Sequence, residues 1–207
     1  MTHPLPLSPD HSDTPSRNAL RKELRSRRRA LSSAQQSLAS ERLALSLLND
    51  PELFRTRHVA IYLANDGEID PQCYITQGRK RGIQFYLPVL HPVHQGRLVF
   101  SPFNEDTVLT PNRFGIPEPG FKSALKRPPW ALDAVLMPLV GFDTEGGRLG
   151  MGGGFYDRTF AFTRYAPRMA PKLIGLAHHC QQVEVLPVEI WDVPLHAIVS
   201  DRGKYRA

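Results

Sequence analysis

The stretch that decides the fold class runs from Asp133 to Arg164 and reads DAVLMPLVGFDTEGGRLGMGGGFYDRTFAFTR. It opens with an apolar run over Asp133–Val140, which is typical of a strand buried on both faces of a parallel sheet. A glycine-rich loop over Gly141–Gly154 follows, and a segment of helical composition then covers Phe155–Arg164. A strand, a loop and a helix in this order form the repeating unit of α/β proteins.

The chain repeats this alternation on both sides of the stretch. The other predicted helices are Arg17–Leu31, Ser32–Asn49, with a capping box from Ser32 to Gln35, and Pro71–Arg81. The other predicted strands are His58–Leu63, Ile83–Val89, Arg97–Phe103, Lys172–Ala177 and Leu195–Val199, with proline-rich loops at Phe114–Pro119 and Lys126–Trp130. Strands interleaved with helices predict a single α/β domain with a largely parallel, doubly wound, three-layer sheet flanked by helices.

Length and composition fit one globular domain. The chain has 207 residues, of which 41% are hydrophobic and 22% charged, so it can bury a sizeable core. Residues 1–16 hold four prolines among Ser, Asp and His, and this composition predicts a disordered N-terminal tail. We therefore assign a single α/β domain to residues 17–207.

No segment predicts a membrane span or secretion. The longest apolar run, Ala134–Phe142, is far shorter than a bilayer span and contains Pro138. The first ten residues lack the basic and apolar regions of a secretory signal. Cys73 and Cys180 are too few for a disulfide framework and fit a reducing compartment, so we expect a cytoplasmic protein.

The formal charge of +6 at pH 7 belongs to one short segment. Residues 17–29 contain seven of the 26 basic residues and one of the 20 acidic residues, so the rest of the chain is neutral. Arg17, Arg21, Arg25 and Arg28 recur at helical spacing and form a basic stripe. Such a stripe is either a solvated helix face or a binding surface for an anion, from DNA down to one triphosphate. Mutual repulsion of its charges favours an anionic partner.

Six glycines crowd the loop before the Phe155–Arg164 helix, namely Gly146, Gly147, Gly150, Gly152, Gly153 and Gly154. Glycine permits positive φ, so that successive N–H groups converge on an anion, and the N-terminus of the following helix adds positive potential. Arg148 supplies a forked donor for phosphate, and Asp157 a hard oxygen ligand for magnesium. The loop is neither a Walker A motif nor a dinucleotide fingerprint. We expect a nucleotide site of another kind, with an ordinary flexible loop as the alternative.

The segment Gly146–Asp157, with the pattern G-x-R-L-G-x-G-G-G-F-Y-D, resembles the hallmark loop of the 5-formyltetrahydrofolate cyclo-ligase (5,10-methenyltetrahydrofolate synthetase) family. Further matching segments occur in the same order, at Ala19–Ser32, Asn65–Pro71, Phe114–Pro119, Asp133–Asp143 and Leu186–Leu195. The resemblance runs from about Arg17 to Asp201. It implies an ATP- and magnesium-dependent enzyme that converts 5-formyltetrahydrofolate to 5,10-methenyltetrahydrofolate, ADP and phosphate.

The resemblance also implies roles for individual residues. Arg148, Tyr156 and Asp157 would be catalytic, and Asp157 and Asp192 would bind magnesium. The ATP-binding residues would be Arg17, Asn18, Arg21, Arg148, Leu149, Gly150, Met151, Gly152, Gly153, Gly154, Phe155 and Tyr156. The residues that bind the folate substrate would be Arg21, Asn65, Glu68, Asp70, Met151, Gly152, Gly153, Gly154 and Phe155. In the loop around Glu68, a carboxylate would accept hydrogen bonds from the pterin amino and ring N–H groups.

Two other functions remain open. The basic helix would suit a nucleic-acid-binding module, but the neutral body and the lack of an aromatic and basic sheet pattern count against it. A doubly wound sheet is also compatible with a relative of phosphosugar isomerases or thioester transferases, which would not need ATP. We expect ATP and 5-formyltetrahydrofolate as partners, no nucleic acid, no membrane, and a monomer.

Several residues have purely structural alternatives. Phe155 and Tyr156 are as consistent with core packing as with a ligand, and Glu68 is also consistent with a capping role. Adjacent residues of a strand face opposite ways, so His179 and Cys180 are not expected to form a nucleophile with its base.

Overall fold

The computed structural model describes residues 16–121 and 125–206. The predicted disordered tail, residues 1–16, lies outside these ranges except for its last residue. Ser16 is the N-cap of helix α1 (Arg17–Arg29), because its hydroxyl accepts a hydrogen bond from Ala19 N at 3.3 Å. Within the described part of the chain, no helix is both long enough and apolar enough to cross a membrane.

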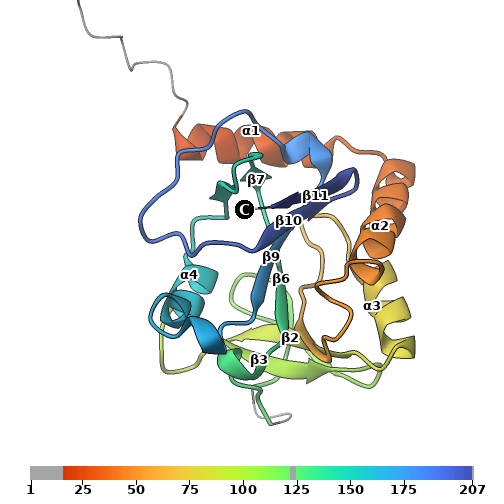
Figure 1. Cartoon of the computed structure of the whole chain (residues 1–207), viewed down its shortest axis with the longest axis vertical. Coiled ribbons are helices and arrows are strands. Elements are labelled where there is room, and N and C mark those ends of the chain that lie inside the picture. The colour runs from red at the N-terminus through yellow and green to blue at the C-terminus, as the bar shows by residue number, and fades with distance from the viewer. Residues whose placement is uncertain (1–15, 122–124, 207) are drawn as a thin grey trace, which may run out of the picture.

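A seven-stranded sheet forms the centre of the molecule (Figure 1). Five neighbouring strands are parallel, and an antiparallel strand closes each edge. In their order across the sheet, the strands are β11 (Gly203–Arg206), β10 (Ala197–Ser200), β9 (Lys172–Ala177), β6 (Ala134–Pro138), β1 (His58–Ala60), β2 (Gln84–Leu90) and β3 (Leu98–Phe103). The prediction of a largely parallel sheet is confirmed.

The order of the strands places a topological switch between β1 and β6. Numbered along the chain, the five parallel strands are arranged 2-1-3-4-5. The connection from β1 passes through α3 (Gln72–Lys80) on one face of the sheet, and that from β6 passes through α4 (Phe155–Phe160) on the other. In open α/β sheets, ligands bind outside the carboxyl ends of the strands at such a switch. The loops after β1 and β6 are therefore the expected walls of a binding site.

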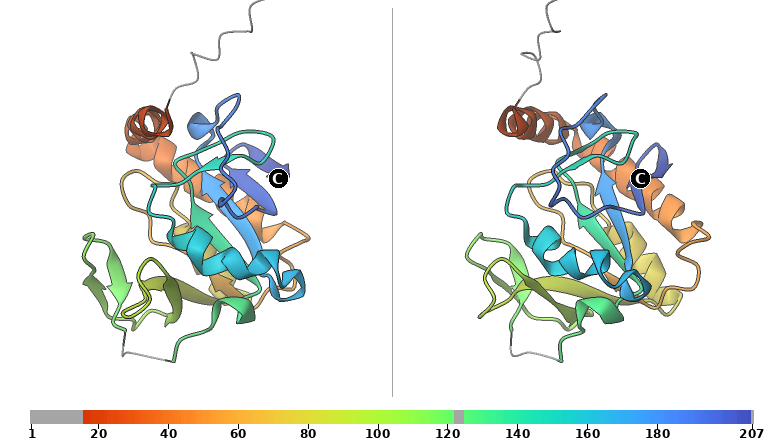
Figure 2. Two further views of the ribbon diagram at one scale, coloured as in Figure 1. Left: turned by 90° about the vertical axis from the view of Figure 1, so that its left-hand side faces the viewer. Right: turned by 60° about the vertical axis from the view of Figure 1, so that its left-hand side comes forward.

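Helices cover both faces of the sheet and produce three layers (Figure 2). α2 (Ser33–Leu48) and α3 lie on one face, and α4 lies on the other with two 3-10 turns, Ala161–Arg164 and Pro167–Met169. Each face has a buried apolar cluster, which includes Leu43 on the first side and Phe160 on the second. The doubly wound, three-layer prediction is confirmed.

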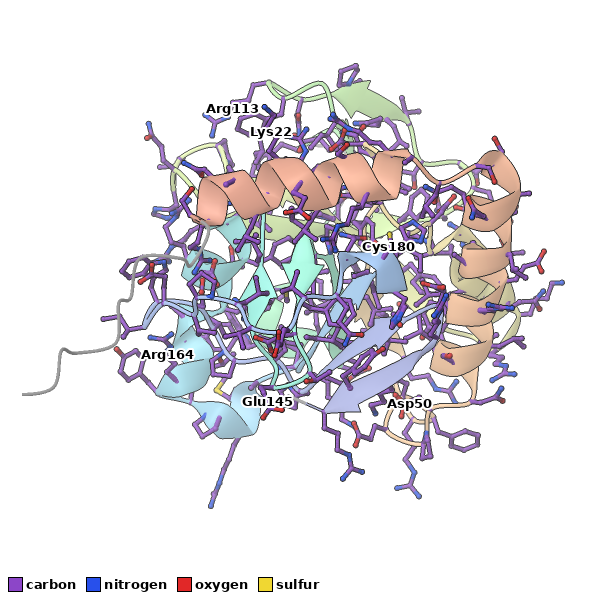
Figure 3. The ribbon with its side chains drawn as sticks, turned by 90° about the horizontal axis from the view of Figure 1, so that it is seen from above. Lys22, Asp50, Arg113, Glu145, Arg164 and Cys180 are labelled. Carbon is purple, nitrogen blue, oxygen red and sulfur yellow. The ribbon has the colours of Figure 1, made fainter. Side chains whose placement is uncertain are left out.

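α1 crosses the carboxyl end of the sheet, over the segments that follow β6 and β9 (Figures 1 and 3). Leu20 and Leu24 on its inner side are buried against Val140 and Leu149. This small apolar cluster holds the helix in place, so that its arginines are within reach of loops at the same end of the sheet.

The glycine-rich stretch is more ordered than predicted. It contains a hairpin of β7 (Gly141–Phe142) and β8 (Arg148–Leu149), which the sequence analysis did not foresee. Asp143 is buried in the turn and accepts hydrogen bonds from the backbone N–H groups of Glu145 and Gly147. Only the part after β8 is an irregular loop.

Other element boundaries differ where contacts distant in sequence decide them. β1 ends at Ala60 rather than Leu63, and α4 gives way to a 3-10 turn after Phe160. His179–Gln181 is also a 3-10 turn, so the argument that treated His179 and Cys180 as strand residues is wrong. The remaining short elements are a 3-10 turn at Pro129–Ala131 and a ribbon of β4 (Leu109–Pro111) and β5 (Pro117–Pro119), the latter within a predicted loop.

Candidate active site

The loop after β1 forms a tight turn at the topological switch. We call residues 65–68 the 65–68 loop. Glu68 N donates to Asn65 O at 3.0 Å, and Glu68 Oε2 accepts from Asn65 N at 3.1 Å. Asp66 has a φ of 55°, the one positive φ among the non-glycine residues within the described ranges. Two of the predicted folate-binding residues, Asn65 and Glu68, thus flank a residue in the left-handed conformation.

The second loop of the site, residues 150–154, is called the glycine loop and connects β8 to α4. Gly152 and Gly154 have φ values of 91° and 61°, a region in which L side chains are strained. In the preceding turn, a Cβ on Gly147 would lie 2.3 Å from Asp143 Oδ2. Glycine is therefore required for backbone conformation at two of these positions and for close approach at the third.

Helix α4 contributes less to the site than the sequence suggested. It has six residues, so fewer peptide dipoles add at the glycine loop than in the longer helix predicted. Phe155 packs edge-on against Phe114 with a centroid separation of 5.8 Å, and Tyr156 stacks on Phe160 at 6.4 Å. Both aromatic residues therefore have a packing role. For the predicted anion site, backbone N–H groups and arginines are therefore the main candidate donors.

Arg21 joins α1 to the glycine loop. Its Nε donates to Gly150 O at 2.8 Å, and its Nη1 donates to Asn18 Oδ1 at 2.7 Å. Burial, and then the nearby charge of Arg17, lower the pKa of Arg21. The predicted ATP-binding residues of α1 thus lie beside the predicted ATP-binding loop.

Arg148 pairs with one of the two carboxylates predicted to bind magnesium and is affected by the charge of the other. Its side chain is buried, and its Nη2 pairs with Asp157 Oδ1, which also accepts from Val193 N at 3.2 Å. Asp192 Oδ2 accepts from Arg17 Nη1 at 3.0 Å. Burial lowers the pKa of Arg148, while the charges of Asp157 and Asp192 oppose that shift. The structure therefore brings together residues that are far apart in the chain.

The two carboxylates fit a magnesium ion that is bound mainly through phosphates. Their hydrogen bonds fall on Oδ1 of Asp157 and Oδ2 of Asp192, which leaves one oxygen of each without a partner among the described residues. Mg²⁺ commonly takes one or two carboxylates plus phosphate oxygens and water. Residues 16–121 and 125–206 contain no group of three or more His, Cys, Asp and Glu that would hold a metal with protein ligands alone.

The carboxyl end of α1 binds the 65–68 loop. Asp66 Oδ2 accepts from Arg25 Nε at 2.7 Å and from Arg28 Nη2 at 2.8 Å, and Asp66 Oδ1 pairs with Arg29. Burial raises the pKa of Asp66, but hydrogen bonds from the three guanidinium groups outweigh it and lower the pKa to about 2. The prediction that the basic stripe faces an external anion is wrong for this half, because its anion is Asp66. Sequence analysis missed this residue, since Asp before Gly reads as a turn.

Glu68 lies two residues from Asp66, but its pKa moves in the opposite direction. Burial raises it to about 7, although Arg28, with Nη2 3.7 Å from Glu68 Oε1, works against the shift. Burial, and then the charge of Glu68, raise the pKa of the Tyr156 hydroxyl. Glu68 and Tyr156 are therefore close enough to interact, which links the 65–68 loop to the start of α4.

Two predicted site residues have structural partners instead. Asp70 Oδ1 accepts from Gln72 N at 2.9 Å, just after Pro71, the N-cap of α3. The side chain of Leu149 is buried in the apolar cluster beneath α1. Binding of folate by Asp70 and of ATP by Leu149 stay predictions.

A cavity and the predicted site residues lie at opposite ends of the sheet. A hollow of about 800 Å³, lined in part by Leu47, Phe54 and Tyr74, lies at the amino ends of β1 and β2. It contains none of the predicted site residues. We place the candidate site at the carboxyl ends, because the switch, the required glycines and Glu68, whose pKa burial raises to about 7, lie there.

A family model described as the 5-formyltetrahydrofolate cyclo-ligase family matches residues 13–201. The chain belongs to this family. It is 42% identical to the 5-formyltetrahydrofolate cyclo-ligase of Escherichia coli (strain K12) over 177 residues, which cover 86% of this chain and 96% of the relative. Identity to the cyclo-ligase of Haemophilus influenzae is 40% over 187 residues, with coverage of 90% and 98%. The protein is thus a cyclo-ligase enzyme of folate metabolism.

Solved structures of cyclo-ligase relatives share the fold. The NMR structure of Aquifex aeolicus 5,10-methenyltetrahydrofolate synthetase has a TM-score of 0.75 at 28% identity and covers 92% of each chain. A 5,10-methenyltetrahydrofolate synthetase from Mycoplasma pneumoniae has a TM-score of 0.68 at 25% identity, with coverage of 89% of this chain and 98% of the other. The resemblance inferred from the glycine loop is confirmed.

Proposed function

We propose that this cyclo-ligase converts 5-formyltetrahydrofolate to 5,10-methenyltetrahydrofolate with ATP and Mg²⁺, and releases ADP and phosphate. The observation that carries the proposal is the convergence of the glycine loop, Arg21 and Glu68 at the switch between β1 and β6. A loop rich in N–H donors suits a triphosphate, and a buried carboxylate suits the N–H groups of a pterin. The family and the names of its relatives support the reaction.

ATP binding is assigned to the glycine loop and the arginines around it. Arg17, Arg21 and Arg148 each keep N–H donors that have no partner among the described residues. These donors and the backbone N–H groups of the loop would bind the triphosphate. Mg²⁺, when bound, neutralises phosphate charge, and Asp157 and Asp192 would hold it.

The folate is assigned to the side of the glycine loop that faces Glu68. With a pKa raised to about 7, Glu68 is partly protonated at neutral pH and both accepts and donates hydrogen bonds. Met151 has 54% of its surface exposed and, with Phe155, offers apolar contact to the ring system. Asn65 supplies a polar group at the opposite end of the 65–68 loop.

Ring closure requires the formyl oxygen to leave. The N5-formyl group is an amide carbonyl, hence a weak electrophile, and hydroxide leaves poorly near neutral pH. In the proposed route the formyl oxygen attacks the γ-phosphorus of ATP, and the bond to ADP breaks. N10 then attacks the formyl carbon and loses its proton, and the carbon–oxygen bond breaks to release phosphate. Arg148 and the glycine loop orient the reactants and stabilise the transferring charge, so no protein nucleophile is needed.

Isotope transfer tests this route. Substrate labelled with heavy oxygen in the formyl group should deliver the label into inorganic phosphate, measured by mass spectrometry of the phosphate. Omission of ATP or magnesium should abolish the absorbance of the methenyl product. Label in bulk water with unlabelled phosphate would exclude phosphorylation of the formyl oxygen.

The metal assignment is tested separately. Asp157→Asn and Asp192→Asn should each shift the magnesium dependence of activity to higher concentration, because a hard divalent ion prefers charged oxygens. Glu145→Gln is the control, since Glu145 is exposed on the β7–β8 turn, well away from α1 (Figure 3). Magnesium profiles of both aspartate variants that superimpose on that of Glu145→Gln would remove these residues from the metal site.

We also propose a monomeric cytoplasmic enzyme. Cys73 and Cys180 are both free thiols, which supports a reducing compartment. Size-exclusion chromatography with light scattering should give one species near 23.3 kDa, and a mass of twice that value would contradict the monomer.

A further inference from the structure

Helix α1 touches three segments of the site in order along its length. Arg17 reaches Asp192, Arg21 reaches Gly150 in the glycine loop, and the arginines at the carboxyl end of the helix reach Asp66 in the 65–68 loop. Because an α-helix rises about 1.5 Å per residue, contacts four residues apart are separated by roughly 6 Å. A single rigid element therefore sets the spacing between the predicted phosphate side and the predicted folate side.

Asp66 is the point at which this helix holds the 65–68 loop. Besides the three guanidinium groups on its carboxylate, its backbone O accepts from Arg28 Nε at 2.9 Å. The adjoining Gly67 is so close to α1 that a Cβ there would lie 3.3 Å from Arg28 O. Gln36 Nε2 donates both to Arg28 O, at 3.3 Å, and to Gly67 O, at 3.4 Å. Side-chain and backbone contacts thus fix the loop to α1.

Arg28 extends the same connection to the end of β6. Its side chain is fully buried, and its Nη1 donates to Leu139 O at 3.4 Å. Gln181 Nε2 also donates to Leu139 O, at 2.8 Å. The chain from Leu139 leads directly into the β7–β8 hairpin and the glycine loop. The carboxylate of Asp66 is therefore connected, through one buried guanidinium, to the strand that positions the phosphate side.

We propose that Asp66 is a positioning residue of the ligase reaction, which locks the 65–68 loop to α1 and so holds Asn65 and Glu68 at a fixed separation from the glycine loop. This inference rests on the proposed function. This role requires no contact between Asp66 and the folate, and no proton transfer by Asp66. Its role is geometric, since phosphoryl transfer to a bound formyl group needs both substrates aligned, and a displacement of about 1 Å costs about 100-fold in rate.

The variant Asp66→Asn tests the role with little change in shape. Asparagine tolerates the left-handed conformation and keeps one acceptor oxygen, but it removes the charge that holds three arginines. We expect kcat to fall about 100-fold and KM for the folate to rise, while the calorimetric Kd for ATP stays within about twofold of wild type. Asp66→Gly, which also permits positive φ, should give the same kinetic loss, because the carboxylate and not the backbone conformation is required.

Asp50→Asn is the matched control. Asp50 is likewise paired, with Oδ2 2.8 Å from Lys204 Nζ, and it is buried, but it lies beside the end of α2, far from α1 (Figure 3). This variant should lower the free energy of unfolding and leave kcat and both KM values unchanged. If Asp66→Asn and Asp50→Asn have the same kinetic constants, Asp66 is merely structural and the proposal is overturned.

Amide hydrogen exchange tests the locking role of Asp66 independently of the ligase reaction. Asp66→Asn should accelerate amide exchange in residues 64–69, and Asp50→Asn should not. Failure of the wild-type enzyme to form any methenyl product would refute the proposed function, while the exchange experiment would still test the contact. Unchanged exchange in residues 64–69 of Asp66→Asn would refute the locking role whatever the activity.

Discussion

Helix α1 carries arginines along its whole length, but the partners of those arginines differ between its two ends. At the amino end, Arg17 and Arg21 bind one carboxylate and two backbone carbonyls of distant loops, together with the side chain of Asn18. At the carboxyl end, three arginines share Asp66, and one of them, Arg28, is fully buried. The same residue type thus has two different electrostatic environments at the two ends of one helix.

These partners divide helix α1 into two halves. The amino-terminal half carries the arginines predicted to bind ligand, and the carboxyl-terminal half anchors the helix to the 65–68 loop. At the amino end, each guanidinium keeps donors without a partner among the described residues, so a phosphate can be added without breaking a buried ion pair. At the carboxyl end, burial makes the ion pairs costly to disturb, because an uncompensated charge would remain in a low dielectric. We therefore expect substitutions at the amino end to affect ligand binding and those at the carboxyl end to affect stability.

Arg28→Met should give the largest effect. The change leaves Asp66 and Glu68 without their buried partner, and breaking such a pair typically costs about 3–5 kcal/mol. Urea denaturation should show this loss in the free energy of unfolding. Arg29→Met, at a side chain that is 53% exposed, is the control and should cost less than about 1 kcal/mol. Equal losses for the two variants would contradict the distinction between buried anchor and exposed partner.

Glu68→Gln should change how stability depends on pH. The pKa of Glu68 is about 7 in the folded protein and 4.5 in the reference state, so the folded protein holds a proton that the unfolded chain releases. The free energy of unfolding of wild type should therefore fall as pH rises from about 5 to 7, by at most about 3 kcal/mol, and then level off. The glutamine variant should lack this slope. Urea denaturation between about pH 4.5 and 8 measures the free energy of unfolding of both proteins. If wild type and Glu68→Gln show the same pH dependence, the burial of this carboxyl is contradicted.

Asp66 should contribute no pH dependence in the same experiment. Its pKa is lowered from 3.8 to about 2, so its ion pairs persist across that range, and their stabilisation is lost progressively as pH falls from about 4 through about 2. The decrease in the wild-type free energy of unfolding above about pH 5 is therefore assigned to Glu68 and not to Asp66.

Arg21→Ala should weaken ATP binding and leave the fold intact. Loss of one charge-assisted contact is worth about 1.5–3 kcal/mol, or roughly 10- to 150-fold in Kd. Calorimetric titration of ATP without folate measures this. Lys22→Ala, at the next position of α1 and exposed (Figure 3), is the control and should bind ATP like wild type. An unchanged Kd for Arg21→Ala would remove the amino end of α1 from the nucleotide site.

Glu23→Gln should have the smallest effect. Glu23 pairs with Arg27 on the solvent side of α1, and both side chains are well exposed. Exposed pairs four residues apart contribute about 0.3–0.5 kcal/mol. A loss above about 1 kcal/mol in urea denaturation would contradict the small contribution expected of a solvent-exposed ion pair.

Sequence analysis recovered the elements whose signals are local. The apolar run that became β6, the Ser32–Gln35 capping box of α2 and the strand Lys172–Ala177 all follow from neighbouring residues. The β7–β8 hairpin was missed because its turn depends on Asp143, which also accepts from Leu186 N at 2.9 Å, 43 positions away. β11 was missed because it owes its place to pairing with β10.

By itself, the sequence determined where glycine is needed, where charge accumulates and which family motif the chain carries, because each of these is a property of consecutive residues. Tertiary structure alone decided the pairing of the charges. Arg28 meets Asp66 across 38 positions and Arg17 meets Asp192 across 175, and no local pattern encodes such distances. Folding also separated the pKa values of Asp66 and Glu68, about 2 and about 7, because three guanidinium groups surround the first carboxylate while burial dominates the second.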